Sequence, residues 1–176
     1  AFVKRKFSRH IFHKHSSHRH IPTARTHPSI GDDMQTNSTL PPIYRALGLA
    51  GLLPFFAGPA LILRGNAPFA ALLFPLYSLA IACFLSGVWW GIAVGRGLRG
   101  VAVAVASNAI LLVAVGAVIF GAPSTAIGVL ALVFLVLLAG DLTLPALATP
   151  FTGYRALRVQ LTVLVIAAHG LMLTLL

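Results

Sequence analysis

The chain has 176 residues, of which 58% are hydrophobic and only 9% are charged. A soluble domain carries about 25% charged residues, so this sequence has too little polar surface for an ordinary water-soluble protein. The net charge of +10 is concentrated in one region, because seven of the 13 basic residues precede Met34. Cys83 is the only cysteine, which excludes a disulfide within one chain.

Residues 1–43 form a basic, His-rich tail, which we expect to lack a packed structure before Met34. Its histidines are interspersed with Arg, Lys and Ser, and no acid precedes Asp32. Three interpretations stay open: a mitochondrial transit peptide, an arm that binds anionic lipid, and an extension upstream of a true start at Met34. Imidazoles bind Zn²⁺, Ni²⁺ and Cu²⁺, but nothing in the tail fixes a ligand geometry, so we expect no metal site.

Five continuous apolar runs follow the tail, and each is long enough for a membrane-spanning helix of about 20 residues. Turn-forming segments that contain Gly or Pro separate them. This pattern predicts an all-α, polytopic transmembrane bundle of five helices over residues 44–176. Pro54 and Pro75 lie inside predicted spans, where each removes a backbone donor and can kink its helix. The predicted spans are residues 44–63, 69–94, 101–120, 125–144 and 157–176.

The basic residues beyond the tail predict the orientation, because short cytoplasmic loops carry an excess of Lys and Arg. With five spans, five of the six basic residues in this region fall on one side, and only Arg64 falls on the other. We therefore expect the N-terminus inside and the C-terminus outside. The corresponding localisation is a bacterial inner membrane with a cytoplasmic N-terminus, or alternatively a mitochondrial inner membrane with the N-terminus in the matrix.

Asp141 is the only acid after Met34, and it lies near the end of the fourth predicted span, on the basic side. A carboxylate at membrane depth needs a partner, and we expect a structural ion pair with Arg96 or Arg158. The alternative is a proton or ion relay, which normally needs several titratable groups. Trp89 and Trp90 suit an interfacial aromatic belt. The candidate functional or structural cluster on this face is Trp89, Trp90, Arg96, Asp141, Tyr154, Arg155 and Arg158.

Three further features are predicted to serve helix packing. Asn108 in the third span and His169 in the fifth are intramembrane polar residues, which usually form hydrogen bonds between helices. The alternatives are ligand binding for Asn108 and proton movement for His169. Gly87, Gly91 and Gly95 form a stripe of small residues, four apart on one face of the second helix. Such a stripe lets another backbone approach closely. The neighbour is either another helix of the same chain, which we expect, or a second subunit.

Several local patterns occur together and in order along the spanning region. Residues 47–55 read Leu-Gly-x-x-Gly-Leu-x-Pro-Phe, and residues 86–91 read Ser-Gly-x-x-Trp-Gly. Asp141 then precedes Tyr154-Arg155-Ala156-Leu157-Arg158. In these motifs the chain resembles the DUF3429 family, whose members are bacterial inner-membrane proteins and the mitochondrial transmembrane protein 69. The family typically has a tryptophan beside the later tyrosine, and this sequence has none there. The resemblance implies a membrane fold and brings no reaction with it.

The sequence contains no catalytic pattern: no Gly-x-Ser-x-Gly, no His-Glu-x-x-His, no phosphate loop and no Cys-x-x-Cys. We therefore expect no enzyme and no cofactor, and the expected partners are the lipid bilayer and other membrane proteins rather than nucleic acid. The leading hypothesis is an accessory or assembly protein of an energy-transducing membrane. The alternative is a small transporter or channel, which predicts a polar cavity lined by Asn108, Asp141 and Arg158.

Overall fold

The computed structural model describes residues 39–147 and 152–176, apart from the side chains of Leu98, Arg99 and Ala146. Most of the His-rich tail, and every prediction made for residues 1–38, lies outside this part of the chain. The described residues fold into helices, and these form five spans that are long and apolar enough to cross a membrane, which confirms the predicted fold class. The elements are α1 (Pro42–Ala50), α2 (Leu53–Leu63), α3 (Ala67–Gly95), η2 (Gly97–Gly100), α4 (Val101–Phe120), α5 (Pro123–Thr143), η3 (Pro145–Leu147) and α6 (Tyr154–Leu175).

The first span is broken into α1 and α2 at Gly51 and Leu52. Pro54 explains the break, because a proline has no N–H for the carbonyl of residue 50 and its ring clashes with that carbonyl. The Phe55 N–H turns to the carbonyl of Leu52, so the Gly51 carbonyl loses its usual helical partner. The Tyr77 hydroxyl on α3 donates a hydrogen bond of 2.7 Å to that Gly51 oxygen. A side chain from the second span therefore satisfies one of the backbone carbonyls that have no helical partner at the break.

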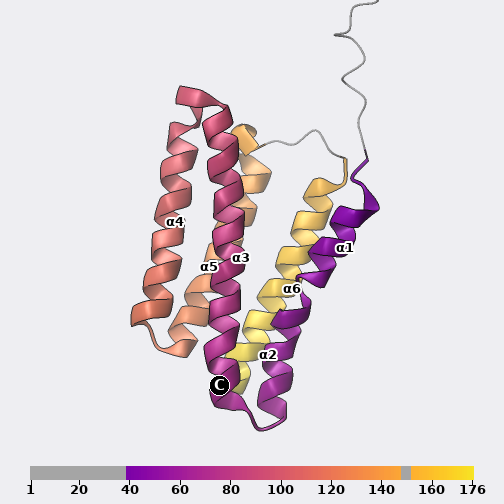
Figure 1. Cartoon of the computed structure of the whole chain (residues 1–176), viewed down its shortest axis with the longest axis vertical. Coiled ribbons are helices and arrows are strands. Elements are labelled where there is room, and N and C mark those ends of the chain that lie inside the picture. The colour runs from indigo at the N-terminus through magenta and orange to yellow at the C-terminus, as the bar shows by residue number, and fades with distance from the viewer. Residues whose placement is uncertain (1–38, 148–151) are drawn as a thin grey trace, which may run out of the picture. The chain divides into compact units, whose positions relative to one another are not determined.

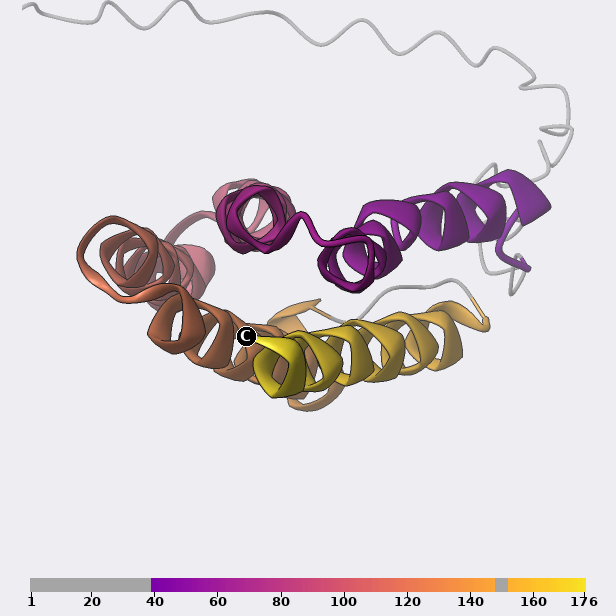
Figure 2. The same ribbon diagram turned by 90° about the horizontal axis from the view of Figure 1, so that it is seen from below.

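Helix α3 has the most neighbours in the bundle. It packs against α2, α4 and α5, and α6 packs against both α5 and α2 (Figures 1 and 2). Successive spans run in opposite directions, so the α3–α4 turn and the start of α6 lie at the same end as α1 (Figure 1). The α2–α3 turn, which carries Arg64, lies at the other end. The predicted separation of basic residues between two ends is therefore present in the fold.

Small buried residues bring α3 and α4 together. Ala82, Ser86 and Ala93 are buried on α3, while Ser107 and Ala114 are buried on α4. At the turn between the helices, a side chain at Gly100 would collide with the backbone of Ala93, so this close approach requires glycine. Large apolar side chains face outward over the rest of the bundle, as expected of a protein whose solvent is lipid.

The expected packing of the glycine stripe against another helix of the same chain is wrong for the described residues, and the alternative of a second subunit stays a prediction. Gly87, Gly91 and Gly95 are exposed, and a side-chain carbon added at any of them would meet no described atom within 4 Å. The stripe turns away from the rest of the bundle because α3 uses the neighbouring face, with Ser86 and Ala93, to meet the other helices. One helix position changes the facing direction by about 100°, so the two stripes point in different directions.

The fourth span ends one residue before its predicted boundary, and the fifth span begins three residues before its predicted start. Leu144 leaves α5 in an extended conformation, and Pro145, which lacks an N–H, cannot continue the helix. Gly153 then precedes α6 with a φ of 85°, a left-handed conformation that glycine adopts without strain. This turn starts α6 at Tyr154, so the helix contains both Tyr154 and Arg158.

Candidate functional site

Asp141 is the centre of a buried polar network that joins three helices. The Trp89 Nε1–H on α3 donates to Asp141 Oδ1 at 2.7 Å, and the Arg158 Nε–H on α6 donates to Asp141 Oδ2 at 2.6 Å. A second guanidinium nitrogen, Nη2, also contacts Oδ2. All three residues are buried: Trp89 is 3% exposed, Asp141 is 9% exposed and Arg158 is 8% exposed. We call these three residues the Asp141 network.

Of the two arginines predicted as partners, the structure selects Arg158. Asp141 lies in the last turn of α5 and Arg158 in the second turn of α6, and the packing of these two helices brings the side chains together. Arg96 is exposed where α3 ends and makes no bond to Asp141 in the described chain. Charge-assisted bonds of this kind are stronger than neutral ones, and both carboxylate oxygens are occupied.

The network also compensates two unfavourable helix dipoles. The C-terminal end of a helix carries partial negative charge, which opposes Asp141 in the last turn of α5. The N-terminal end carries partial positive charge, which opposes Arg158 near the start of α6. Pairing the two side chains offsets both effects at once. The arrangement therefore fixes the junction of α5 and α6 rather than leaving either charge free.

Gly140 makes room for the tryptophan. A side-chain carbon added at Gly140 would collide with Cη2 and Cζ2 of the Trp89 indole. The ring thus lies directly over the α5 backbone, one residue before Asp141, and this position directs Nε1 to the carboxylate. Sequence reasoning assigned Trp89 to an interfacial belt and missed this role. The available signal was that a buried indole N–H requires an acceptor, and Asp141 is the only acid of the spanning region.

The other members of the predicted cluster do not join the network. Trp90 is 51% exposed, Arg96 and Arg155 are exposed, and Tyr154 is half-buried. Arg96 ends α3, and Arg155 lies in the first turn of α6, so both flank the network at the same end of the bundle. The predicted cluster therefore divides into a closed buried part and an exposed basic and aromatic part.

His169 lies in an aromatic enclosure at the other half of the bundle, away from Asp141. It is completely buried, and its Nδ1 is 2.8 Å from the carbonyl oxygen of Val165 on the same helix. Because a carbonyl can only accept, this contact places the proton on Nδ1. Nε2 has no partner in the described chain. The rings of Phe55, Phe74 and Phe134 surround the imidazole, with centroids 4.9–5.6 Å away.

This enclosure differs from the predicted role of His169. The expected hydrogen bond to a neighbouring helix is replaced by one within α6. Phe74 and Phe134 meet the imidazole in edge-on geometries with interplanar angles of 70° and 67°. Edge-to-face pairs of this kind are a favourable packing geometry for aromatic rings. The histidine therefore contributes to packing among α2, α3, α5 and α6.

Asn108 is exposed on α4, where its amide donates to the Ala104 carbonyl at 2.9 Å, one turn earlier in the same helix. It makes no bond to another helix of the described chain. Ser107, its neighbour, is buried and donates to the same Ala104 oxygen at 2.9 Å. The predicted interhelical bond of Asn108 is thus absent from this part of the structure.

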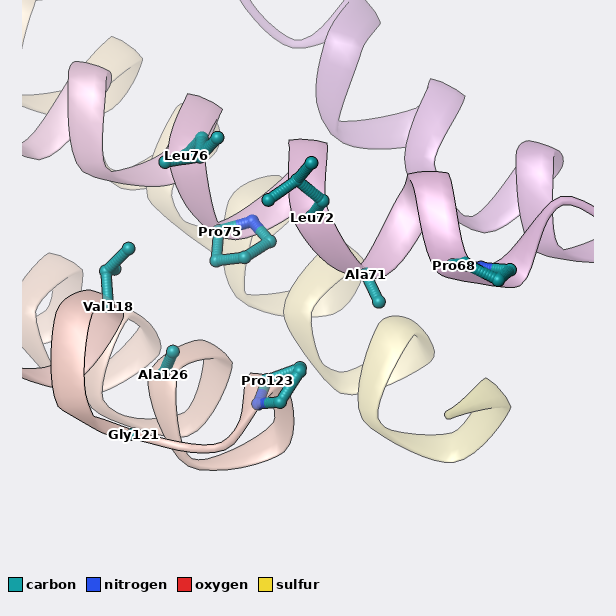
Figure 3. Close-up of a pocket in the computed structure, with 9 residues that line it drawn as sticks. All are labelled: Pro68, Ala71, Leu72, Pro75, Leu76, Val118, Gly121, Pro123 and Ala126. Carbon is teal, nitrogen blue, oxygen red and sulfur yellow. The ribbon is translucent and has the colours of Figure 1, made fainter.

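Two cavities are lined by apolar residues. One, of about 300 Å³, lies where α3 begins and α4 meets α5 (Figure 3). Its lining consists of Pro68, Ala71, Leu72, Pro75, Leu76, Val118, Gly121, Pro123 and Ala126. The other, of about 390 Å³, lies between α2 and α3 and contains one polar side chain, Tyr77. Neither cavity is lined by Asn108, Asp141 or Arg158, the three residues expected to line a transport pathway.

Comparison with known proteins agrees with the motifs. Residues 40–174 match the family described as "Protein of unknown function (DUF3429)", which is most of the chain. No curated protein and no solved structure matches the chain. The match includes all five spans except the last residue of α6, together with every residue of the Asp141 network. The resemblance seen in the sequence is confirmed, and the chain belongs to the DUF3429 family.

Proposed function

We propose that this chain is a non-enzymatic integral membrane protein that supports or assembles other membrane components. The observation that supports the proposal is that the polar residues at the basic end of the bundle are of two kinds, buried and paired or exposed and basic. Trp89 and Arg158 donate hydrogen bonds to both oxygens of the buried Asp141 carboxylate, whereas Arg96 and Arg155 beside it are exposed. The buried, hydrogen-bonded groups stabilise this end of the bundle, and the exposed basic side chains are available to bind a partner.

The Asp141 network supports this function by fixing the surface. It connects α3, α5 and α6 at one end of the bundle, and all three side chains are buried. Arg155 is three residues before Arg158 on α6, and Trp90 directly follows Trp89 on α3. Residues held this close to a buried ion pair have little freedom to move apart. We call Trp90, Arg96 and Arg155 the basic-end surface, and we propose it as the docking site for another membrane component.

The transport alternative gains no specific support. It expected Asn108, Asp141 and Arg158 to line one cavity, but Asn108 is exposed on α4 and the other two bind each other. An accessory role needs no such pathway. For the localisation we propose an inner membrane, bacterial or mitochondrial, with the basic end on the cytoplasmic or matrix side. The excess of arginine at that end supports this orientation.

Affinity purification from native membranes in mild detergent tests the proposal. The bait is the tagged full chain, compared with the double variant Arg96→Gln/Arg155→Gln and with the control Arg64→Gln. Arg64 is also an exposed arginine, but it lies in the turn at the opposite end. We expect the same membrane proteins to be recovered with the wild type and the control, and to be lost with the double variant. A chain recovered alone, or equal losses in both variants, would contradict the proposal.

A further inference from the structure

The exposed amide of Asn108 is a polar group at membrane depth. It lies eight residues beyond Gly100, about 12 Å along a helix that spans about 30 Å, and so near the middle of the span. One N–H of the amide donates to Ala104. The other N–H and Oδ1 have no partner among the described residues, and the side chain faces the apolar exterior. Lipid tails offer neither donor nor acceptor, so a protein partner is the chemistry that would satisfy this amide.

The surface beside Asn108 is open. Gly87 on α3 directly follows the buried Ser86, and Asn108 on α4 directly follows the buried Ser107. Each step of one residue along a helix turns the direction of the side chain by about 100°. Because the two helices run in opposite directions, the step from Ser86 to Gly87 and the step from Ser107 to Asn108 turn toward the same side of the helix pair. Ala93 faces Gly100 at the turn, so Gly87 and Asn108 lie about 9 Å and about 12 Å from it along their helices. The glycine and the amide therefore share one outer face at similar depth.

We propose that this face binds a second copy of the chain, with Asn108 of the two copies forming a pair of hydrogen bonds across a two-fold axis. A two-fold interface presents the same patch on both subunits, so each group must complement itself. A primary amide meets this condition, because it carries both a donor and an acceptor. Two copies with the same orientation in the bilayer are related by an axis along the membrane normal, which places the two Asn108 residues at equal depth. This inference does not rest on the basic-end surface.

Cysteine cross-linking tests the geometry while leaving Asn108 intact. Cys83 is the only native cysteine, so the background is the full chain with Cys83→Ala. Val105→Cys and Leu112→Cys flank Asn108 at one turn on either side, and both positions are exposed. The control is Leu132→Cys, an exposed position near the middle of α5. We expect oxidation in membranes to give dimers from the α4 variants and several-fold less from the control. Equal yields from all three would overturn the proposal.

Two further variants test the amide and the open face. Asn108→Leu, added to Leu112→Cys, removes both bonds of the pair and is expected to lower self-association about tenfold. Asn108→Gln keeps a primary amide and is expected to retain most of it. Gly91→Leu fills the open face on α3. A side-chain carbon added at Gly91 would meet no described atom within 4 Å, so the variant should block the second copy and leave the monomer folded.

Co-purification of two differently tagged copies in mild detergent provides the second measurement. Recovery of both tags with the wild type and Asn108→Gln, and loss with Asn108→Leu, would support the pair. Association that Asn108→Leu leaves unchanged would overturn the proposal. Recovery of another membrane protein through this face, without the second tag, would also overturn it.

Discussion

Trp89 and Asp141 are 52 positions apart in the sequence, yet the indole Nε1–H donates to the carboxylate at 2.7 Å. This bond joins α3 to α5 at the point where Arg158 joins α5 to α6. A tryptophan that sequence patterns assign to the membrane interface is thereby part of the interior. The relationship explains how a lone acid persists in a membrane protein: each of its oxygens has a donor from a different helix.

Replacement of Trp89 by Phe keeps an aromatic ring and removes the donor. The Oδ1 atom of Asp141 would then be buried without a hydrogen-bond donor, which lowers the free energy of unfolding by about 1–3 kcal/mol. Thermal unfolding in detergent should show a lower midpoint for Trp89→Phe. Trp90→Phe is the matched control, because Trp90 is half exposed and makes no bond to Asp141. Equal midpoints for the two variants would contradict the assigned role.

Gly140→Ala should destabilise the protein more than an ordinary glycine replacement. The added methyl group would collide with the Trp89 indole over the α5 backbone, and overpacking of this kind typically costs about 1–3 kcal/mol. Gly128→Ala is the control on the same helix, because its added carbon would meet nothing within 4 Å. Membrane abundance and unfolding midpoint should both fall for Gly140→Ala and change little for Gly128→Ala. The opposite order would show that Trp89 does not lie where the structure has it.

Tyr77→Phe tests the backbone break in the first span. The variant keeps the ring beside Phe55, whose centroid is 5.0 Å away, and removes the hydroxyl that donates to Gly51. Leaving that carbonyl without its side-chain donor should cost about 1 kcal/mol. Tyr44→Phe, at an exposed tyrosine, is the control. If the two variants unfold at the same midpoint, the Gly51 carbonyl finds another donor and the capping role is wrong.

His169→Phe should fold with little change in stability. The native side chain has a buried Nε2 without a partner, and phenylalanine would place a fourth ring in an enclosure of Phe55, Phe74 and Phe134. Replacing a buried polar group that lacks a hydrogen-bond partner with an apolar group often leaves the free energy of unfolding nearly unchanged. His169→Lys, which introduces a charge there, should instead reduce membrane abundance severely. Loss of the folded protein with His169→Phe would show that the imidazole makes a contact beyond packing.

The five spans could be predicted from the sequence because an apolar run of about 20 residues needs no knowledge of its neighbours. The boundaries moved by up to three residues, since Pro145 and Gly153 act through local backbone geometry. The break at Gly51 was harder to predict: Pro54 indicated a kink, but not the tyrosine on another helix that stabilises it.

The candidate site was only partly predictable for a similar reason. Asp141 was identifiable as the lone acid, but several arginines lie in the flanking loops, and only the fold selects Arg158. The glycine stripe misled because small residues indicate where a helix can be approached, not whether a neighbour is present. The α3–α4 contact depends on Ser107 and Ala114 of the partner helix, which no pattern within α3 reveals.

A double-mutant cycle between Asp141 and Arg158 tests the central claim most directly. Asp141→Ala alone leaves the Arg158 charge buried and unpaired, which should cost about 3–5 kcal/mol, whereas Asp141→Ala with Arg158→Met removes both charges and should recover much of that loss. The measurement is unfolding free energy in detergent, together with abundance in the membrane. Arg155→Met, at an exposed arginine three residues away, replaces Arg158→Met in the control pair and should give no recovery. A double variant as unstable as the sum of its single variants would contradict a structural ion pair between Asp141 and Arg158.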